Sequence, residues 1–515
     1  KAYANAFYGL IPGGVSVLDD TDSDIQVPNN INSFLWGQYV VPTEGGVWQK
    51  SSWQNIRNIN YFMTHYQSVQ AAEADVNIYV AEMRFFRALE YFNKIQLLGD
   101  VPWLEVDLNV DSEELYGPKM KRNQVFQKII EDLDFAIQWL PEAGSEEANR
   151  LNKDIARHVK ARFCLNEGTH YKYHDELEYA SEAEKWLQMA ATESDKLITS
   201  GRYEIYNTGH PQEDYFNMYR IDDKSDLKEA VLYVDYKTNI REHNMAAAGR
   251  EAGCGFSKSF VESFLCSDGL PISLSNKYLG DETMRKETAN RDPRLKQLIL
   301  TNDFPTNVTD DLKDSTFVVN EDEFITQHCF TGYRPIKGFN PIYSQALYMK
   351  SSFDGIAYRY AETLLINAEA KAELNTITNA DLDRTVNQLR DRVGMPHLTV
   401  NVGFTDPKWP DWGYSLSPVL QEIRRERCIE LAGEGFRFND LKRWKAGKLL
   451  NNVLTYVGKR KPDGNLAIVY PNYTNPDLSY QAGKSRTWED KMYLYPIPTG
   501  ELQRNPQLLP QNPGW

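Results

Sequence analysis

The segment from Ala71 to Leu98 restricts the fold more than any other part of the chain. Apolar and small residues recur there every three or four positions, at Ala81, Phe85, Ala88, Leu89, Phe92 and Ile95. This is the period of an α-helix with one buried face. Gly99 and Pro102 follow and end the pattern. We therefore expect a long helix here and a mainly α fold around it.

The same period returns in shorter stretches. It predicts helices at Gln124–Leu140, Ile155–Asn166 and Ala180–Thr199, and again at Ile356–Leu374, Asp381–Val393 and Ser417–Leu450. Each of the first three has about the length of one arm of a tetratricopeptide-like hairpin. No clean 34-residue repeat is present, so any such hairpins are degenerate. The helical scaffold is expected mainly in residues 1–14, 53–200 and 356–450.

Residues 202–350 have a different character. The helical period weakens, Gly and Pro increase, and short β-like runs occur at Ala230–Tyr236 and Phe317–Val319. This region is predicted to be a loop-rich, irregular insertion with few short strands. Residues 451–515 are rich in Pro and Asn and are predicted to form an extended strap.

Composition excludes several functions. The net charge of −15 argues against nucleic acid, whose phosphates require basic patches. No apolar run approaches the ~20 residues of a membrane-spanning helix. Five cysteines are an odd number with no metal-binding spacing, although Cys254 and Cys266 could pair in a secreted protein. Aromatic residues make up 12% of the chain, and they supply platforms for apolar ligand faces as well as core.

Motifs for catalysis or metal binding are absent or incomplete. There is no HExxH or GxSxG, and the triplet Gly483-Lys484-Ser485 lacks the upstream glycine of a phosphate loop. His170 and His174 could share a helix face, but a solvated helix end is favoured over a metal site. Asp20, Asp22 and Asp24 alternate like the start of a calcium loop, yet Ile25 replaces its glycine, so an acidic surface turn is favoured. We predict no metal and no cofactor.

Three segments together carry a family resemblance. The first is Ala81-Glu-Met-Arg-Phe-Phe-Arg-Ala88 with Leu98-Gly-Asp-Val-Pro102, the second is Arg424-Arg-Glu-Arg-Cys-Ile-Glu-Leu-Ala432 with Asp440-Leu-Lys-Arg-Trp444, and the third is Tyr493-Leu-Tyr-Pro-Ile-Pro498 with Gln511-Asn-Pro-Gly514. In this order they resemble the RagB/SusD family of surface nutrient-binding lipoproteins. The similarity extends over essentially the whole chain, so we expect one SusD-like domain over residues 1–515.

Charges within these segments have a structural interpretation. Glu82 could reach an arginine one turn away on its own helix. Glu426, Glu430 and Glu434 repeat every four residues, and Arg427, Arg437 and Arg443 are the partners expected for them. A pairing network is favoured over a catalytic one, although a glycoside hydrolase using this row stays open as a remote alternative.

The resemblance implies a function as well as a fold. Members of this family have a tetratricopeptide-like helical scaffold, and a less regular half carries the ligand surface. They are anchored in the outer membrane by a lipid on an N-terminal cysteine, which would lie outside this chain. They bind oligosaccharides or polysaccharides without catalysis and pass them to a SusC-type TonB-dependent transporter. A receptor for peptides or glycopeptides on the same scaffold is the alternative, and a helical scaffold with only protein partners is another.

Ligand-binding residues cannot be transferred through the motifs, so they are chosen by chemistry. Sugar recognition needs aromatic platforms beside polar side chains. The candidates are Asn30, Trp36 and Tyr39 in the first long loop, with His243 and Phe256 in the insertion. For Trp36, a buried loop anchor is an equal alternative. Further loop tryptophans are Trp409 and Trp412, whereas core packing is favoured for Trp48, Trp53 and Trp444.

Overall fold

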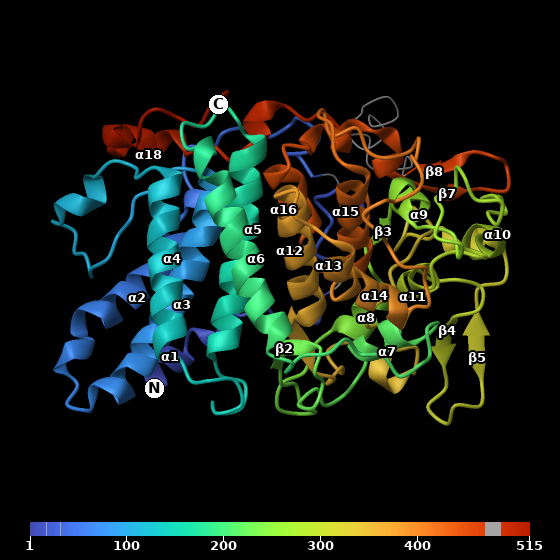
Figure 1. Cartoon of the computed structure of the whole chain (residues 1–515), viewed down its shortest axis with the longest axis horizontal. Helices are drawn as coiled ribbons and strands as arrows, with labels where there is room; N and C mark the ends of the chain where they lie inside the picture. Colours follow the sequence, from blue (N-terminus) through green and yellow to red (C-terminus); the bar gives the residue numbers. More distant parts are fainter. Residues whose placement is uncertain (17, 31, 469–485) are drawn as a thin grey trace.

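The computed structural model describes residues 1–16, 18–30, 32–468 and 486–515. The Gly483-Lys484-Ser485 triplet and part of the predicted strap lie outside these residues. Long helices form one half of the molecule, and short helices, strands and loops form the other (Figure 1). The mainly α prediction with few short strands is confirmed. No helix in the described ranges is long and apolar enough to cross a membrane.

Helical hairpins build the scaffold half. Its helices pack in chain order, α3 on α2 and α4, α5 on α4 and α6, and then α12 on α6, and Figure 1 shows α3 to α6 running side by side. Their bounds are α1 Ala2–Asn5, α2 Gln54–His65, α3 Glu73–Leu98, α4 Arg122–Trp139, α5 Lys153–Tyr173, α6 Ala183–Thr199 and α12 Tyr360–Glu373. The predicted long helix is α3, and Gly99 ends it with a φ of +74° that side chains disfavour.

Close packing between neighbouring helices depends on specific residues. The Asn152 side chain accepts a hydrogen bond from the Ile155 amide and so caps the start of α5. A Cβ on Gly168 would lie 2.9 Å from the backbone nitrogen of Leu187, so only glycine allows α6 to approach α5 here. The rings of Phe92 and Phe163 stack with centroids 3.6 Å apart between α3 and α5.

Ion pairs in the scaffold join α3 to other segments, which corrects the expected pairing within α3. Glu82 accepts hydrogen bonds from Arg150 at 2.6 Å and from the Tyr8 hydroxyl at 2.6 Å. Arg87 reaches Asp132 on α4 through two bonds of 2.7 Å. These side chains point across the helix interface, where burial strengthens charge-assisted hydrogen bonds.

The loop-rich half consists of short elements. Its strands form two-stranded antiparallel sheets, in which β1 pairs with β3, β2 with β6, β4 with β5, and β7 with β8. Their bounds are β1 Gln26–Pro28, β2 Ala230–Val234, β3 Cys254–Phe256, β4 Pro305–Val308, β5 Ser315–Phe317, β6 Gly355–Arg359, β7 Val457–Arg460 and β8 Leu466–Ile468. The short helices between them are α7 Asp214–Tyr219, α8 Met245–Arg250, α9 Lys258–Ser263, α10 Met284–Thr288 and α11 Arg294–Leu298.

The later helices are shorter than predicted. They are α13 Asn379–Asp383, α14 Val386–Arg392, α15 Pro418–Glu430 and α16 Arg437–Arg443. A short helix that was not predicted, α18 Thr499–Arg504, lies within the region expected to be an extended strap. The helix predicted from Ile356 begins only at Tyr360, because Gly355–Arg359 pairs with β2 instead. Helical spacing over so short a run cannot exclude a buried strand.

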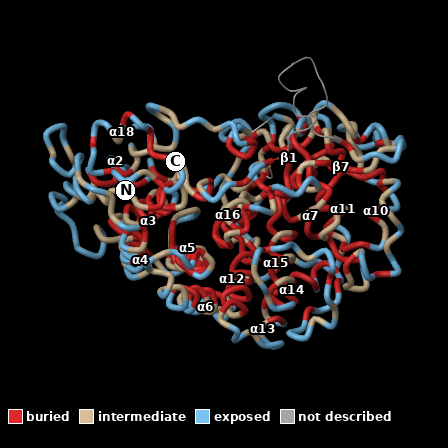
Figure 2. Tube along the Cα trace, turned by 90° about the horizontal axis from the view of Figure 1, so that it is seen from above, coloured by how far each residue is buried: buried red, intermediate tan, exposed pale blue. Residues whose placement is uncertain are grey.

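Separate groups of buried apolar residues support the two halves. One group lies among α2 to α6 and α12, and a second lies among α7, α9, α11 and the adjoining loops. A third contains Trp36, Trp412, Trp444 and Trp488 beneath the chain end. Seen from above, buried segments run through both halves and meet near α12, α15 and α16 (Figure 2).

The described part of the chain end lies across the scaffold (Figure 1). The Tyr495 amide donates to the Leu97 carbonyl at 2.7 Å, and the Asn512 side chain donates to the Leu98 carbonyl at 2.9 Å. Both carbonyls belong to the last turn of α3. Backbone carbonyls in the last turn of a helix have no N–H donor within that helix. The chain end therefore caps α3.

Candidate ligand-binding cleft

A cleft of about 450 Å³ lies where the two halves meet. One wall comes from α3 and α5, and the other comes from residues 10–19, β6 and residues 434–443. This volume falls within the usual range for small-ligand sites. Position alone makes the cleft a candidate site, because ligand sites often form between structural units.

Four carboxamide side chains line this cleft, and we call them the cleft amides: Asn93, Gln96, Asn166 and Asn439. All four are at least partly exposed to solvent. Within the described residues, none of their side-chain nitrogen or oxygen atoms has a hydrogen-bond partner. Each amide offers two N–H donors and a carbonyl acceptor. The cleft therefore presents both donors and acceptors to a ligand.

Apolar surface lies beside the cleft amides. Leu89 and Phe436 line the cleft and are partly buried, while Phe92 and Phe163 form its inner side. The Phe436 ring also has the Arg162 guanidinium 5.0 Å from its centroid. A ligand with one apolar face and several hydroxyl groups could contact both kinds of surface.

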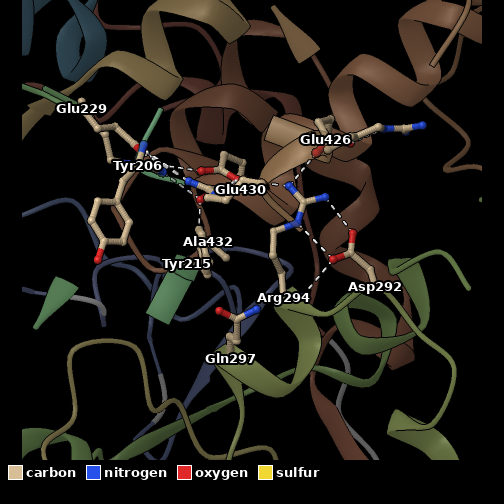
Figure 3. Close-up of polar contacts among 12 residues, drawn as sticks. Tyr206, Tyr215, Glu229, Asp292, Arg294, Gln297, Glu426, Glu430 and Ala432 are labelled. Atoms are coloured by element: carbon tan, nitrogen blue, oxygen red, sulfur yellow. Dashed lines mark hydrogen bonds and ion pairs between the residues drawn. The ribbon is translucent and has the colours of Figure 1, made fainter. Parts of the chain in front are cut away.

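The glutamate row behind this wall forms a buried network (Figure 3). Glu430 contacts Arg359 at 2.5 Å, Arg392 at 2.6 Å and Arg294 at 3.1 Å. The network has five acidic and five basic members: Glu229, Asp292, Glu426, Glu430 and Glu434 with Arg294, Lys337, Arg359, Arg390 and Arg392. Opposite charges are thus equal in number, which permits burial.

Pairing of the row is confirmed, but the expected partners are wrong. Arg427 contacts Asp440 at 2.8 Å, Arg443 contacts Glu369 at 2.6 Å, and Arg437 contacts Asp24 at 2.7 Å. These arginines point away from the glutamates of their own segment. Sequence proximity suggested local pairs, whereas the fold brings in arginines from β6, α11 and α14.

The electrostatics of this row do not suit acid–base catalysis. Burial alone would raise the pKa of Glu430, but Arg392, Arg359 and Arg294 outweigh it and hold the pKa far below its ordinary value. Arg359 and Lys337 likewise outweigh burial and lower the pKa of Glu434. A general acid needs a pKa raised toward the working pH, which is the opposite shift.

In the acidic turn at Asp20–Asp24, Asp20 and Asp24 are buried and Asp22 is exposed, which partly corrects the predicted surface turn. Asp20 accepts hydrogen bonds from the backbone amides of Gly433 at 2.7 Å and Arg437 at 2.9 Å. Burial raises the pKa of Asp20 to about 7, although these amides oppose the shift. The turn therefore binds the chain between α15 and α16. This structural role explains the aspartates without a calcium loop.

Three predicted ligand residues are buried in the structure. Phe256 has 0% of its surface exposed, and Trp36 and His243 have 6% each. Phe256 lies in the second core, Trp36 packs edge-on against Tyr456, and the His243 imidazole contacts the Phe353 carbonyl at 3.0 Å. None of them presents a ring face to solvent, so the geometry does not support stacking with a ligand at these positions.

Asn30 and Tyr39 remain accessible. Asn30 is exposed and Tyr39 is partly exposed. The Tyr39 ring meets Phe34, Tyr495 and Trp515 with centroid distances of 5.4, 5.8 and 5.7 Å. This group, the Tyr39 cluster, does not line the cleft.

The other tryptophans have mixed positions. Trp444 is fully buried, and Trp48 and Trp53 are partly buried against the scaffold core with ring centroids 5.2 Å apart. Trp412 is buried, and the Trp409 indole donates to Glu422 at 2.7 Å. Core packing therefore explains most of these rings.

Histidine and cysteine pairs show no ligand geometry. The His170 and His174 rings lie tilted with centroids 4.1 Å apart, but both are buried, which corrects the expected solvated helix end. Cys254 and Cys266 are both free thiols. Among the described residues, no group of three or more His, Cys, Asp or Glu side chains is arranged to hold a metal.

Sequence reasoning missed the cleft amides because they lie in helices assigned to the scaffold. Asn93 and Gln96 are three positions apart on α3, and Asn439 lies in the Arg437–Trp444 segment. Their spacing places Asn93 and Gln96 on one helix face. The spacing could have indicated a pair of amides on one face of α3. It could not have indicated that Asn166 and Asn439, on other helices, line the same cleft.

Comparisons with known proteins agree on one family. Residues 199–515 match the model of the SusD family. SusD-like protein P2 of Formosa agariphila is 25% identical over 456 residues, which cover 86% of this chain and 75% of that protein.

Two solved structures from Bacteroides fragilis share the fold. One is a SusD-like protein with a TM-score of 0.75 and 23% identity, covering 100% of this chain and 96% of the other. The second is described as a SusD-like carbohydrate-binding protein, with a TM-score of 0.70, 20% identity and 98% coverage of both chains. Because the family model matches more than half of its residues, the chain belongs to the SusD family.

Proposed function

We propose that this protein is a non-catalytic glycan-binding protein of the cell surface. It would bind an oligosaccharide or polysaccharide and deliver it to a SusC-type TonB-dependent transporter. A lipid anchor outside this chain would hold it on the outer membrane. Membership of the SusD family and the carbohydrate-binding description of a similar structure support this proposal.

The observation that carries the proposal is the set of unpartnered cleft amides. Sugar hydroxyl groups both donate and accept hydrogen bonds, which matches what Asn93, Gln96, Asn166 and Asn439 offer. The less polar face of a sugar ring could lie against Leu89 and Phe436. Residues already held in internal hydrogen bonds could not bind a ligand without losing those bonds.

The expected affinity is modest. Four hydrogen bonds at about 1 kcal/mol each and one apolar contact of about 1–2 kcal/mol give roughly 5–6 kcal/mol. That corresponds to a dissociation constant on the order of 0.1 mM. Such weak binding is sufficient when the receptor is tethered beside its transporter, since tethering raises the effective concentration.

A receptor for peptides or glycopeptides is the second candidate. Carboxamides pair with peptide groups as readily as with hydroxyl groups, so the cleft amides favour neither ligand by themselves. The carbohydrate-binding description of the similar structure favours glycans. A glycoside hydrolase has less support, because the pKa values of Glu430 and Glu434 are lowered.

The test compares glycan binding by the native protein and by an Asn93→Ala, Asn166→Ala double variant. Gel retardation on a polysaccharide panel identifies a ligand, and calorimetry on an oligosaccharide of that polymer gives the affinity. We expect the double variant to bind about tenfold more weakly or worse. Asn77→Ala, on α3 but outside the cleft, is the matched control and should bind normally.

Other outcomes would redirect the proposal. Unchanged binding by the double variant would place the glycan elsewhere on the protein. Retention of a peptide panel with no glycan bound would favour the peptide receptor, and release of reducing ends would indicate a hydrolase. Copurification of the full-length protein with a TonB-dependent transporter from native outer membranes tests the delivery step.

A further inference from the structure

A small recess opens from one end of the cleft. It shares Gln96, Asn166, Asn439 and Arg443 with the cleft, and it adds Arg122, His170, Lys442 and Tyr493. Its volume is about 10 Å³, which is close to the space that one water-sized atom requires. No carboxylate lines the recess among the described residues, whereas three basic side chains do.

Lys442 is the unusual member of this recess. It is only 8% exposed, and its Nζ donates to the Gln96 carbonyl at 2.7 Å. No ion pair with a described carboxylate accompanies that bond. Lys258 and Lys337 are buried too, but Lys258 contacts Glu287 and Lys337 contacts Glu434, each at 2.6 Å. An ammonium group has three donors, so Lys442 keeps unused capacity.

Arg427 provides a second unfilled donor on the wall of the cleft. Its Nε donates to Asp440 at 2.8 Å, but its buried Nη1 atom has no hydrogen-bond partner. A buried donor without a partner costs about 1–3 kcal/mol, and more for a charged group. An acceptor supplied by a ligand would remove that cost.

Apart from Asp19, the acidic side chains that line the cleft have other basic partners and leave Lys442 without one. Glu362 is paired with Arg162, Glu434 with Lys337, and Asp440 with Arg427 and Arg443. Asp19 has no basic partner, but it is exposed and belongs to the wall formed by residues 10–19. Arg122 and Arg443 are paired with Glu167 and Glu369, so among the described residues Lys442 is the unpaired charge of the recess, in a protein whose net charge is −15.

We propose that the recess end of the cleft binds an anionic substituent of the glycan, a carboxylate or a sulfate group, through Lys442, with Arg427 of the cleft wall as a second donor. This inference rests on the proposed function and specifies its ligand. One oxygen of the substituent would enter the recess toward the Lys442 ammonium. The sugar ring itself would stay in the wider cleft against the cleft amides.

Burial and the neighbouring Arg122 lower the pKa of Lys442 to about 7. This shift agrees with an ammonium that lacks a counter-charge in the free protein. A bound anion would supply one, so the charged form of Lys442 would be favoured in the complex.

Lys442 has one competing role, as a cap for α3. Gln96 lies in the last turn of this helix, and a lysine at that end stabilises the exposed carbonyls. A purely capping role would make the loss of Lys442 equally harmful for every ligand. Ligand dependence therefore separates the two roles.

The experiment measures binding of three oligosaccharides of equal length, one neutral, one containing uronic acid and one sulfated. Lys442→Met removes the charge and keeps most of the side-chain volume. Lys448→Met is the matched control, because it removes the same charge from an exposed position nearby. Thermal melting establishes that each variant is folded before calorimetry.

We expect Lys442→Met to weaken binding of an acidic oligosaccharide about tenfold, or ~1.4 kcal/mol, and to change binding of the neutral one less than twofold. Lys448→Met should leave both unchanged. Whether the uronate or the sulfated ligand loses more identifies the anion. Equal losses for neutral and acidic ligands, or no loss for any, would overturn the inference.

An Arg427→Gln variant provides a second measurement should Lys442→Met fail to fold. It keeps a polar side chain but removes the charge and the unpaired Nη1 donor, and we again expect selective loss of the acidic ligand. A native protein that binds neutral glycans through the cleft amides and shows no preference for acidic ones refutes this inference alone. A native protein that binds no glycan in the cleft refutes the proposed function.

Discussion

The two halves of the molecule are stabilised in different ways. In the scaffold, α3, α5 and α6 are 26, 21 and 17 residues long, and each buries an apolar face against its sequence neighbours. In the other half, α7 to α11 are five or six residues long, and its sheets have two strands. Elements this short are not stable by themselves.

Ion pairs show part of the same contrast. Arg87–Asp132 and Arg122–Glu167 join helices that are close in the sequence, although Arg162–Glu362 joins α5 to α12 across 200 residues. The network around Glu430 joins segments up to about 200 residues apart, from Glu229 just before β2 to α15. Helices that pack on their sequence neighbours need few contacts with distant segments, whereas loops need such contacts to fix their positions. The difference suggests that buried charges give the irregular half its unique arrangement.

The strongest test of this comparison removes the central charge of the network. Glu430→Gln keeps the side-chain shape but leaves three buried arginines with one carboxylate fewer. Removing one member of a buried ion pair costs about 3–5 kcal/mol, so the urea midpoint should fall sharply. Glu167→Gln in the scaffold, which leaves one arginine unpaired, should cost less.

Glu176→Gln is the exposed control for both variants. Glu176 contacts Lys445 at 2.6 Å on the surface, where a pair contributes at most about 1 kcal/mol. Equal destabilisation by Glu430→Gln and Glu167→Gln would remove the distinction between the two halves.

A Trp36 variant tests whether the third group of buried residues stabilises the packing of the first loop against the chain end. Replacing a buried Trp by Ala typically costs about 3–5 kcal/mol, and we expect about 3 kcal/mol for Trp36→Ala because some surface stays exposed. Urea unfolding measures this loss. Weaker glycan binding with an unchanged unfolding midpoint would instead restore Trp36 as a ligand platform.

The scaffold was more predictable than the rest of the fold. Local periodicity and terminators such as Gly99 determine α3, so its bounds followed from nearby residues alone. The strand Gly355–Arg359 was missed because its structure depends on β2, more than 100 residues away. Pairing partners of Glu430 were unpredictable for the same reason, since three distant segments supply its arginines.

The candidate site was less predictable than the fold. Trp36 and Phe256 were chosen because aromatic loops bind sugars, but apolar rings in loops also fill cores, and burial cannot be read from composition. Asn93 and Asn439 lie in segments that the sequence assigns to the helical scaffold. Only the arrangement of α3, α5 and α16 around one cleft shows that their amides converge.

A smaller effect is expected from pH at the recess. The folded pKa of Lys442, about 7, is below its value of 10.5 in the unfolded chain. The folded protein therefore binds fewer protons between these values, so stability from this group rises from pH 7 to pH 10. Arg122, His170, Arg443 and Tyr493 surround the recess, and of these only Tyr493 titrates in the basic range, with a pKa raised by burial.

Urea unfolding at several pH values, with Lys442→Met for comparison, measures this contribution. The variant should lose part of the rise in stability between pH 7 and pH 10. A pH dependence identical to that of the native protein would show that the Lys442 ammonium already has a sufficient partner.

The smallest expected effect concerns the Tyr39 cluster, where a variant tests whether residues outside the cleft contribute to ligand binding. Tyr39 is partly exposed and contacts Phe34, Tyr495 and Trp515, so Tyr39→Ala should cost only about 1 kcal/mol of stability. We also expect its affinity for a long oligosaccharide to fall about threefold, because a chain that fills the cleft could extend onto these rings. Tyr39→Phe keeps the ring and should bind normally. A trisaccharide too short to reach from the cleft to Tyr39 should bind all three proteins equally, and any loss with that ligand would mean that Tyr39→Ala acts through the fold rather than by contact.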